Sequence, residues 1–140
     1  MNDFSIYAAD AVKIQALLQA YRQSTNCEYV LLSHRDGAVI AEAGEIEKES
    51  STLSVLCTAS FDSAQQIGMI LGEPGFQAVS YLGKSRSVYI SAVGNSILLM
   101  QVYPDDRLPK NIDSYSTKLV ELLIDAVPAF TQDSSNNLSR

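Results

Sequence analysis

The residues best suited to acid–base or nucleophilic chemistry stand almost side by side, as Ser33, His34 and Asp36. A serine–histidine–aspartate triad is assembled from separate segments, because neighbours in one turn cannot converge on one reacting atom. We therefore expect no catalytic residues and no enzymatic activity of the chain's own, and we interpret His34 as an exposed turn residue rather than a base.

The two cysteines and the single histidine do not predict a metal site. Cys27 and Cys57 lie far apart in the sequence, and no ligand spacing typical of zinc surrounds them. We expect both thiols to be buried apolar groups, and we expect neither a metal nor another cofactor. The first residues, 1–4, lack the basic and apolar stretches of a signal peptide, so a cytoplasmic location is expected.

The loop Gly72-Glu73-Pro74-Gly75 is rich in glycine but does not predict a phosphate site. It lacks the Gly-Lys-Ser/Thr ending of a P-loop, and it precedes a strand rather than a helix. We therefore do not expect this chain to bind a nucleotide itself.

Composition narrows the classes of partner. The chain has 140 residues, of which 46% are apolar, and a net charge of −6 from 10 basic and 16 acidic residues. A nucleic-acid module or a protein bound to an anionic membrane needs a basic face, so both classes are disfavoured. The length fits one domain, which we place at residues 1–130, followed by a disordered Ser/Asn-rich tail at 131–140.

The elements that must carry any site can be predicted from periodicity and turn residues. An Asp-Gly pair between the first two predicted strands indicates a β-hairpin. The last strand is a nearly continuous apolar run, as expected of a central strand covered on both faces. The predicted fold is an α/β (α+β) sandwich with a five-stranded antiparallel sheet, helices on both faces and the element order α-β-β-α-β-β-β-α. The predicted helices are 5–24, 50–71 and 110–130, with the last turn ended or kinked by Pro128, and the predicted strands are 27–33, 38–41, 76–82, 87–93 and 96–103.

The segment 42–49 contains four glutamates and one lysine. A solvated linker is the favoured interpretation, and an acidic docking site is the alternative. These carboxylates also precede a predicted helix, whose amino terminus favours negative charge.

The predicted helix at 50–71 is unusual because it has one charged residue, Asp62, in twenty-two. Ten of its residues are Ser, Thr, Gln or Asp, so it is not a membrane span. A back face of small, neutral and apolar residues suits a second packed surface, and the alternative is a Ser-rich helix that merely lacks charge. Its expected core stripe is Leu53, Leu56, Cys57, Ser60, Ala64, Ile67 and Leu71.

Two blocks carry a resemblance to a known family. They are 29–41, Tyr-Val-Leu-Leu-Ser-His-Arg-Asp-Gly-Ala-Val-Ile-Ala, and 71–99, from Leu-Gly-Glu-Pro-Gly through Ser-Val-Tyr-Ile-Ser-Ala-Val-Gly-Asn-Ser-Ile-Leu-Leu. Together with the helices they resemble the roadblock/dynein light chain family, in its bacterial and archaeal branch of MglB-like regulators. The resemblance implies a roadblock/profilin-like fold.

The resemblance also implies partners. Roadblock domains form homodimers through the second helix and third strand, and in the MglB-like branch the helix pair docks a small Ras-like GTPase. MglB-like proteins accelerate GTP hydrolysis by repositioning the GTPase's own switch segments, without inserting an arginine. A non-catalytic scaffold or adaptor in a dynein-type or signalling complex is the alternative, and a profilin-like or PAS-like ligand sensor is a third interpretation.

Helix geometry and the resemblance together assign two sets of residues. For the dimer interface we expect Ala59, Ser63, Gln66 and Ile70 on the helix, with Val79 and Tyr81 on the third strand. For GTPase binding we expect Val55, Thr58, Asp62, Gln65 and Met69.

Overall fold

A computed structural model describes residues 8–46 and 49–131 and confirms the predicted element order. Residues 5–7 of the predicted first helix and 132–140 of the predicted tail lie outside the described residues. The elements are α1 (Ala8–Thr25), β1 (Tyr29–His34), β2 (Val39–Gly44), α2 (Ser50–Leu71), β3 (Ala78–Leu82), β4 (Ser87–Val93), β5 (Ile97–Tyr103) and α3 (Ile112–Ala126).

The five strands form one antiparallel sheet in the order β2-β1-β5-β4-β3. Strand β5 is central, and all seven of its residues are buried, as its sequence, apolar except for Gln101, predicts. The three strands β3, β4 and β5 make a meander, and β1 returns to the other side of β5. The edges of the sheet are β2 and β3.

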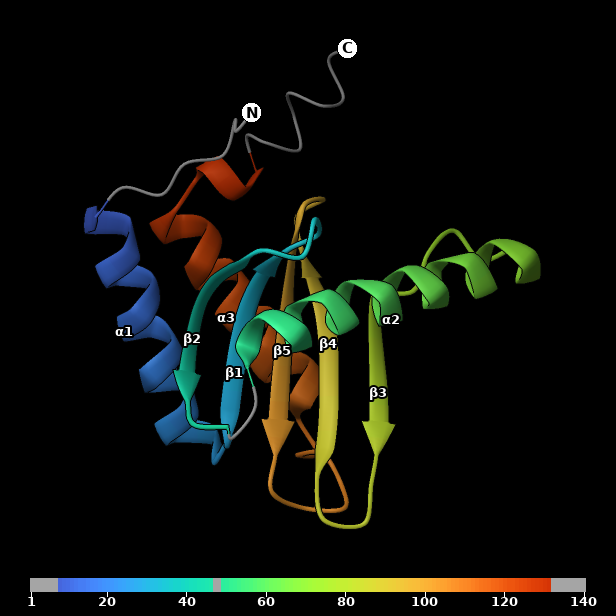
Figure 1. Ribbon diagram of the computed structural model, residues 1–140, viewed down its shortest axis with the longest axis horizontal. Helices are drawn as coiled ribbons and strands as arrows, with labels where there is room; N and C mark the ends of the chain where they lie inside the picture. The colour runs from blue at the N-terminus through green and yellow to red at the C-terminus, as the bar shows by residue number, and fades with distance from the viewer. Residues whose placement is uncertain (1–7, 47–48, 132–140) are drawn as a thin grey trace.

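Helices cover both faces of this sheet, which completes the predicted sandwich (Figure 1). Helices α1 and α3 lie together on one face, and α2 alone crosses the other. The core is accordingly divided by the sheet into two clusters. One contains Ile14, Leu18 and Leu123 with the α1/α3 face of the strands, and the other contains Cys57 and Phe61 with the α2 face.

The local chemistry explains where the helices end. Asn26 takes a positive φ of 63° directly after α1, a conformation that Asn tolerates better than most residues. Gly72, at φ 80°, ends α2, and the next amide, of Glu73, donates to the carbonyl of Gly68 in a Schellman arrangement. The third helix begins at Ile112, two residues later than predicted. It breaks after Ala126, just before Pro128 as predicted, and a short helical stretch follows at 129–131.

The acidic segment 42–49 differs from the favoured expectation of a solvated linker. Strand β2 continues through Gly44, and Glu42 accepts hydrogen bonds from the Tyr29 hydroxyl at 2.6 Å and the Ser50 hydroxyl at 3.1 Å. The carboxylate of Glu42 therefore links the sheet to the first residue of α2, where the positive end of the helix dipole favours it. Glu47 and Lys48 lie outside the described residues.

A buried polar network spans the α1/α3 side of the core. The side-chain oxygen of Gln101 accepts the hydroxyls of Tyr21 and Tyr103, both at 2.6 Å, and its amide nitrogen donates to Ser116 at 3.1 Å. Gln101 is fully buried on central strand β5. It thereby connects α1, the sheet and α3. The Tyr21 and Tyr103 hydroxyls lie 3.2 Å apart, so without Gln101 one could donate to the other, and the second would lose its acceptor.

We predict that Gln101→Leu lowers the free energy of unfolding by about 3 kcal/mol, because a buried polar group left without a partner costs about 1–3 kcal/mol. Urea titration followed by circular dichroism measures this change. Adding Tyr21→Phe and Tyr103→Phe to the same variant removes the stranded hydroxyls and should restore part of the loss. A triple variant less stable than Gln101→Leu alone would contradict this account.

Candidate functional site

Helix α2 faces the sheet with different residues from those expected. Its buried residues are Ser54, Cys57, Phe61 and Gly68. Of the expected core stripe, Cys57 is buried, and Leu53, Ser60 and Ala64 are half-buried. The expectation is wrong for three leucine and isoleucine residues: Leu56 is 57% exposed, Ile67 55% and Leu71 71%.

Two physical reasons account for this rotation of the helix. Phe61 is the largest side chain that α2 buries, and the small residues Ser54 and Gly68 on the same face let the helix lie close to its neighbours. A β-carbon on Gly68 would stand 3.3 Å from the ring of Phe76, so no larger residue fits there unchanged. In addition, the carboxyl-terminal end of α2 projects beyond edge strand β3 and has no sheet beneath it (Figure 1).

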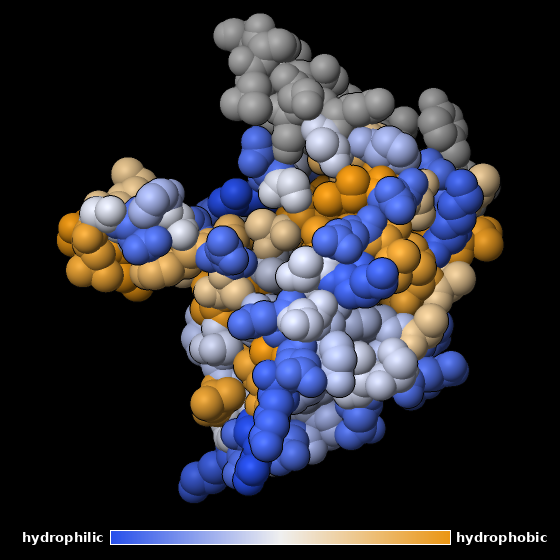
Figure 2. Space-filling model, turned by 180° about the vertical axis from the view of Figure 1, so that it is seen from behind, coloured by the Kyte–Doolittle hydropathy of each residue, from blue (hydrophilic) through white to orange (hydrophobic). Residues whose placement is uncertain are grey.

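The side of α2 that faces away from the core is apolar and nearly uncharged. We call this surface the α2 surface, and its exposed large hydrophobic residues are Val55, Leu56, Ile67, Met69, Ile70 and Leu71. Figure 2 shows hydrophobic residues gathered at the projecting end of the helix. An apolar cluster of this kind is typical of a protein–protein contact.

The residues expected at the dimer interface lie mostly on this outward side. Ala59, Ser63, Gln66 and Ile70 are all exposed. On β3, Tyr81 is exposed and its hydroxyl is hydrogen-bonded to that of Ser60.

Val79 differs from the rest of the set, because it is half-buried and packs against the α2-side core. The interface assignment as a whole remains a prediction.

The residues expected to bind the GTPase are less uniform. Val55 and Met69 are exposed, whereas Thr58 is half-buried and donates its hydroxyl to the carbonyl of Ser54. The amide group of Gln65 is occupied, because it donates to the carbonyl of Phe76 at 2.9 Å and accepts the amide of Phe76 at 3.2 Å.

Asp62 pairs with Arg35 in the β1–β2 turn, and the Arg35 guanidinium lies 5.4 Å from the centre of the Phe61 ring. Arg35 therefore ties the turn to α2, a role that the sequence analysis missed. The arginine and aspartate lie 27 positions apart, so spacing carries no sign of the pair.

Strand β3, which α2 crosses, has an unpaired outer edge in the part of the chain that the structure describes. Within the described residues β3 pairs with β4 alone, and Ser80, Tyr81 and Leu82 are exposed. An unpaired strand edge presents free amide and carbonyl groups, which another strand can join.

The structure does not bring the serine, histidine and aspartate together as a triad. Ser33 is fully buried, and its hydroxyl lies beside the Cys57 thiol. His34, at the end of β1, accepts the amide of Asp36 with Nδ1 at 3.1 Å. Successive residues of a strand point to opposite faces, so Ser33 and His34 diverge.

Both cysteines are buried, as expected. Burial raises the pKa of the Cys57 thiol to about 11 and also raises the pKa of Cys27. Neither sulfur is therefore a ready nucleophile, because the thiolate is the reactive form. Among the described residues no group of three or more His, Cys, Asp or Glu side chains could hold a metal ion.

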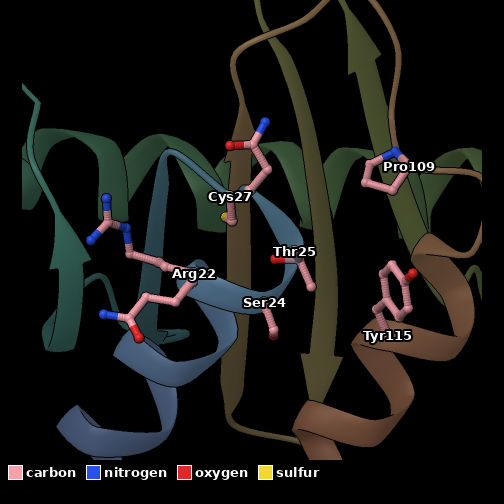
Figure 3. A pocket seen from close by; sticks show the side chains of 8 residues that line it. Arg22, Ser24, Thr25, Cys27, Pro109 and Tyr115 are labelled. Carbon is pink, nitrogen blue, oxygen red and sulfur yellow. The ribbon is translucent and has the colours of Figure 1, made fainter.

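A recess of about 510 Å³ lies between the end of α1 and the start of α3 (Figure 3). The Arg22 guanidinium points away from Tyr115 across it, and the thiol of Cys27 donates to backbone carbonyls of Tyr29 and Val102. These groups do not converge on a common point, so the recess offers no reactive constellation.

Among the described residues, no helix combines the length and the apolar character that a membrane span requires.

Comparison with known proteins identifies the fold. No protein-family model and no curated protein matches the chain. Among solved structures, MglB of Myxococcus xanthus is similar over 91% of this chain and 96% of its own, with 20% identity and a TM-score of 0.79.

Two further solved structures are similar. The gliding protein MglB of Thermus thermophilus matches over 92% of this chain and 98% of its own, at 22% identity and a TM-score of 0.78. A roadblock/LC7 domain of Streptomyces avermitilis matches over 82% and 95%, at 14% identity and a TM-score of 0.69. The resemblance to the roadblock family is thus confirmed for the fold, in its MglB-like form.

We predict that alkaline pH destabilises the protein through its buried thiol. The Cys57 thiol ionises near its ordinary pKa of 9.0 when unfolded and only near 11 when native. Between these values the unfolded state loses a proton that the native state keeps, so stability is full below pH 9 and falls as pH rises.

Urea titrations from pH 7 to 11 measure this dependence. Cys57→Ala should make the decline above pH 9 shallower by about 1 kcal/mol per pH unit. Ser51→Ala, at an exposed position of the same helix, should leave the slope unchanged. Equal slopes in the wild type and in Cys57→Ala would contradict the assignment.

Proposed function

We propose that the protein is a homodimeric regulator of a small Ras-like GTPase, and that the α2 surface and β3 form its working face. The observation that carries this proposal is the exposed apolar side of α2, whose carboxyl-terminal end projects beyond the open edge strand β3 (Figure 1). The likeness in fold to MglB supports it. One solved MglB is described as having a tetrameric arrangement, which agrees with a fold that associates with itself.

The low charge of α2 and the open edge of β3 favour a dimer. The one charged residue of α2, Asp62, is already paired with Arg35, so a second copy would have little charge to desolvate. Pairing of β3 with β3 of a second copy would satisfy its free edge, and the projecting end of α2 would then lie over the second copy. We assign to this contact the outermost and carboxyl-terminal residues, above all Ile70 with Leu71 and Tyr81.

The GTPase contact is assigned to the amino-terminal half of α2 beside the β1–β2 turn. A β-carbon on Gly37 would stand 3.2 Å from Val55, so the turn and the helix form one continuous surface there. This surface is held by the pair of Arg35 and Asp62 and lies away from the projecting end of the helix.

The mode of action follows from what this surface lacks. Helix α2 contains no Lys, Arg or His, and its one carboxylate, Asp62, is paired with Arg35 of the adjoining turn. A protein with such a face would stimulate GTP hydrolysis by binding more tightly to the conformation in which the GTPase's own switch segments are arranged for hydrolysis. Binding would then increase the population of that conformation. If the protein does not stimulate hydrolysis, the same face would bind partners as part of a non-catalytic scaffold.

We predict that Ile70→Glu converts the dimer to a monomer without unfolding it. The Ile70 side chain is 85% exposed in one copy, so the change does not disturb that copy's core. Burying an isoleucine contributes about 2–3 kcal/mol per copy, and an unpaired carboxylate in the contact adds a further cost.

Size-exclusion chromatography with light scattering measures the mass, and circular dichroism verifies folding. The matched control is Val12→Glu on α1, where the side chain is 70% exposed on a different surface. The control should remain a dimer. A wild-type protein that is monomeric at high micromolar concentration would contradict the dimer.

We predict that Val55→Arg abolishes GTPase binding while the dimer persists. A long cation at this exposed position would face the docked partner without a counter-charge. The Ras-like GTPases of the same genome, purified and loaded with a non-hydrolysable GTP analogue, serve as ligands in calorimetry. Val12→Arg is the matched control, and unchanged binding by Val55→Arg would refute the assignment.

Single-turnover GTP hydrolysis then separates the regulator from the scaffold. A GTPase that binds the wild type should hydrolyse GTP faster in its presence, and Val55→Arg should remove the acceleration. Binding without acceleration would favour the scaffold function.

A further inference from the structure

A second concave surface lies on the face of the sheet opposite α2. It is a groove of about 740 Å³ between α3, the back of β4 and the connection 74–77 that leads into β3. It opens on the side of the molecule drawn in Figure 2. Helices α1 and α3 do not extend over β3, so the groove has no helix on its outer side (Figure 1).

The outer wall of the groove is held in place by α2. The amide group of Gln65 binds both the backbone N–H and the carbonyl of Phe76, as a neighbouring strand would. The ring of Phe76 in turn packs against Gly68. The wall is thus preorganised by side-chain and backbone contacts, and an occupant would not have to order it first.

The charges that line the groove have one sign. Among its described lining residues the charged ones are Asp113 and Glu121, both on α3 and both exposed. The carboxylate of Asp113 accepts the hydroxyl of Tyr89 at 2.7 Å, which orients it above the floor. The lining also includes the apolar residues Phe76, Ala78 and Val120.

The spacing of the carboxylates sets the shape of an occupant. Asp113 and Glu121 are eight positions apart on one helix, which corresponds to about 12 Å along its axis. An extended chain covers this distance in about four residues, and residues i, i+2 and i+4 then point to the same side.

We propose that this groove binds an extended segment of a partner protein in which two lysine or arginine residues stand four positions apart and flank a central apolar residue. The two cations pair with Asp113 and Glu121, and the apolar residue lies against Phe76 and Val120. Because the groove and the α2 surface are on opposite faces of the sheet, both can be occupied at once.

The probe is the fluorescein-labelled peptide Gly-Ser-Lys-Ser-Leu-Ser-Lys-Ser-Gly, titrated with the full chain and followed by anisotropy. The expected result is binding that weakens with added salt. Amide chemical-shift changes should be confined to the groove.

Comparison peptides carry Glu for both Lys, or place the two Lys side by side, and both should bind at least about tenfold more weakly. No binding of the probe at millimolar concentration, or equal binding of the Glu peptide, would overturn the proposal.

Two pairs of variants locate the site. Asp113→Asn combined with Glu121→Gln should weaken binding about tenfold, whereas Asp125→Asn, an exposed carboxylate of α3 outside the groove, should not. Thr117→Trp fills the groove from an exposed position and should block the peptide, while Ser114→Trp on the same helix should not.

Unchanged binding in both groove variants, or shifts on α2 instead, would overturn the assignment. The mass of the dimer reports separately on the proposed function and should not change in any of these variants.

Discussion

The complete burial of β5 is the constraint on which the rest of the structure depends. Each of its seven residues lies in the interior, so both faces of the sheet must be covered. The pair α1 and α3 covers one face, but a single helix, α2, covers the other. One helix laid across five strands buries one of its own sides and leaves the opposite side outward. Because that outward side is apolar here, covering β5 creates the α2 surface.

Much of the fold could be predicted because its signals are local. The bounds of α2 and β4 agree with the predicted ranges 50–71 and 87–93, and turn residues such as Asn26 and Gly72 mark helix ends. The central position of β5 also followed from its largely apolar run. These signals depend on residues within a few positions of one another, which is the range over which periodicity and turn chemistry act.

The rotation of α2 could not be predicted for a different reason. Leu56, Ile67 and Leu71 recur with helical period, and such a stripe looks the same whether it packs on its own sheet or on another molecule. The side that is buried, with Ser54 and Gly68, is marked by small residues rather than large ones. The stripe assigned to the core thus became part of the candidate interface.

Contacts distant in sequence complete the candidate sites. Three of these contacts join residues whose spacing follows no local rule. They are the ion pair of Arg35 with Asp62, the hydrogen bonds of Gln65 with Phe76 and the hydrogen bond of Ser50 with Glu42. They arise where elements cross. The same contacts position the β1–β2 turn beside α2 and the wall of the groove behind the sheet, so α2 organises both faces of the molecule.

Hydrogen–deuterium exchange of the β3 amides, measured across a wide range of protein concentration, tests the central claim most directly. The account predicts that β3 and the end of α2, residues 67–71, exchange slowly at high concentration, where a second copy covers them. They should exchange faster on dilution, while β5 stays protected throughout. Exchange of β3 that is fast and independent of concentration would contradict the claim that this edge and the α2 surface are covered by a second copy.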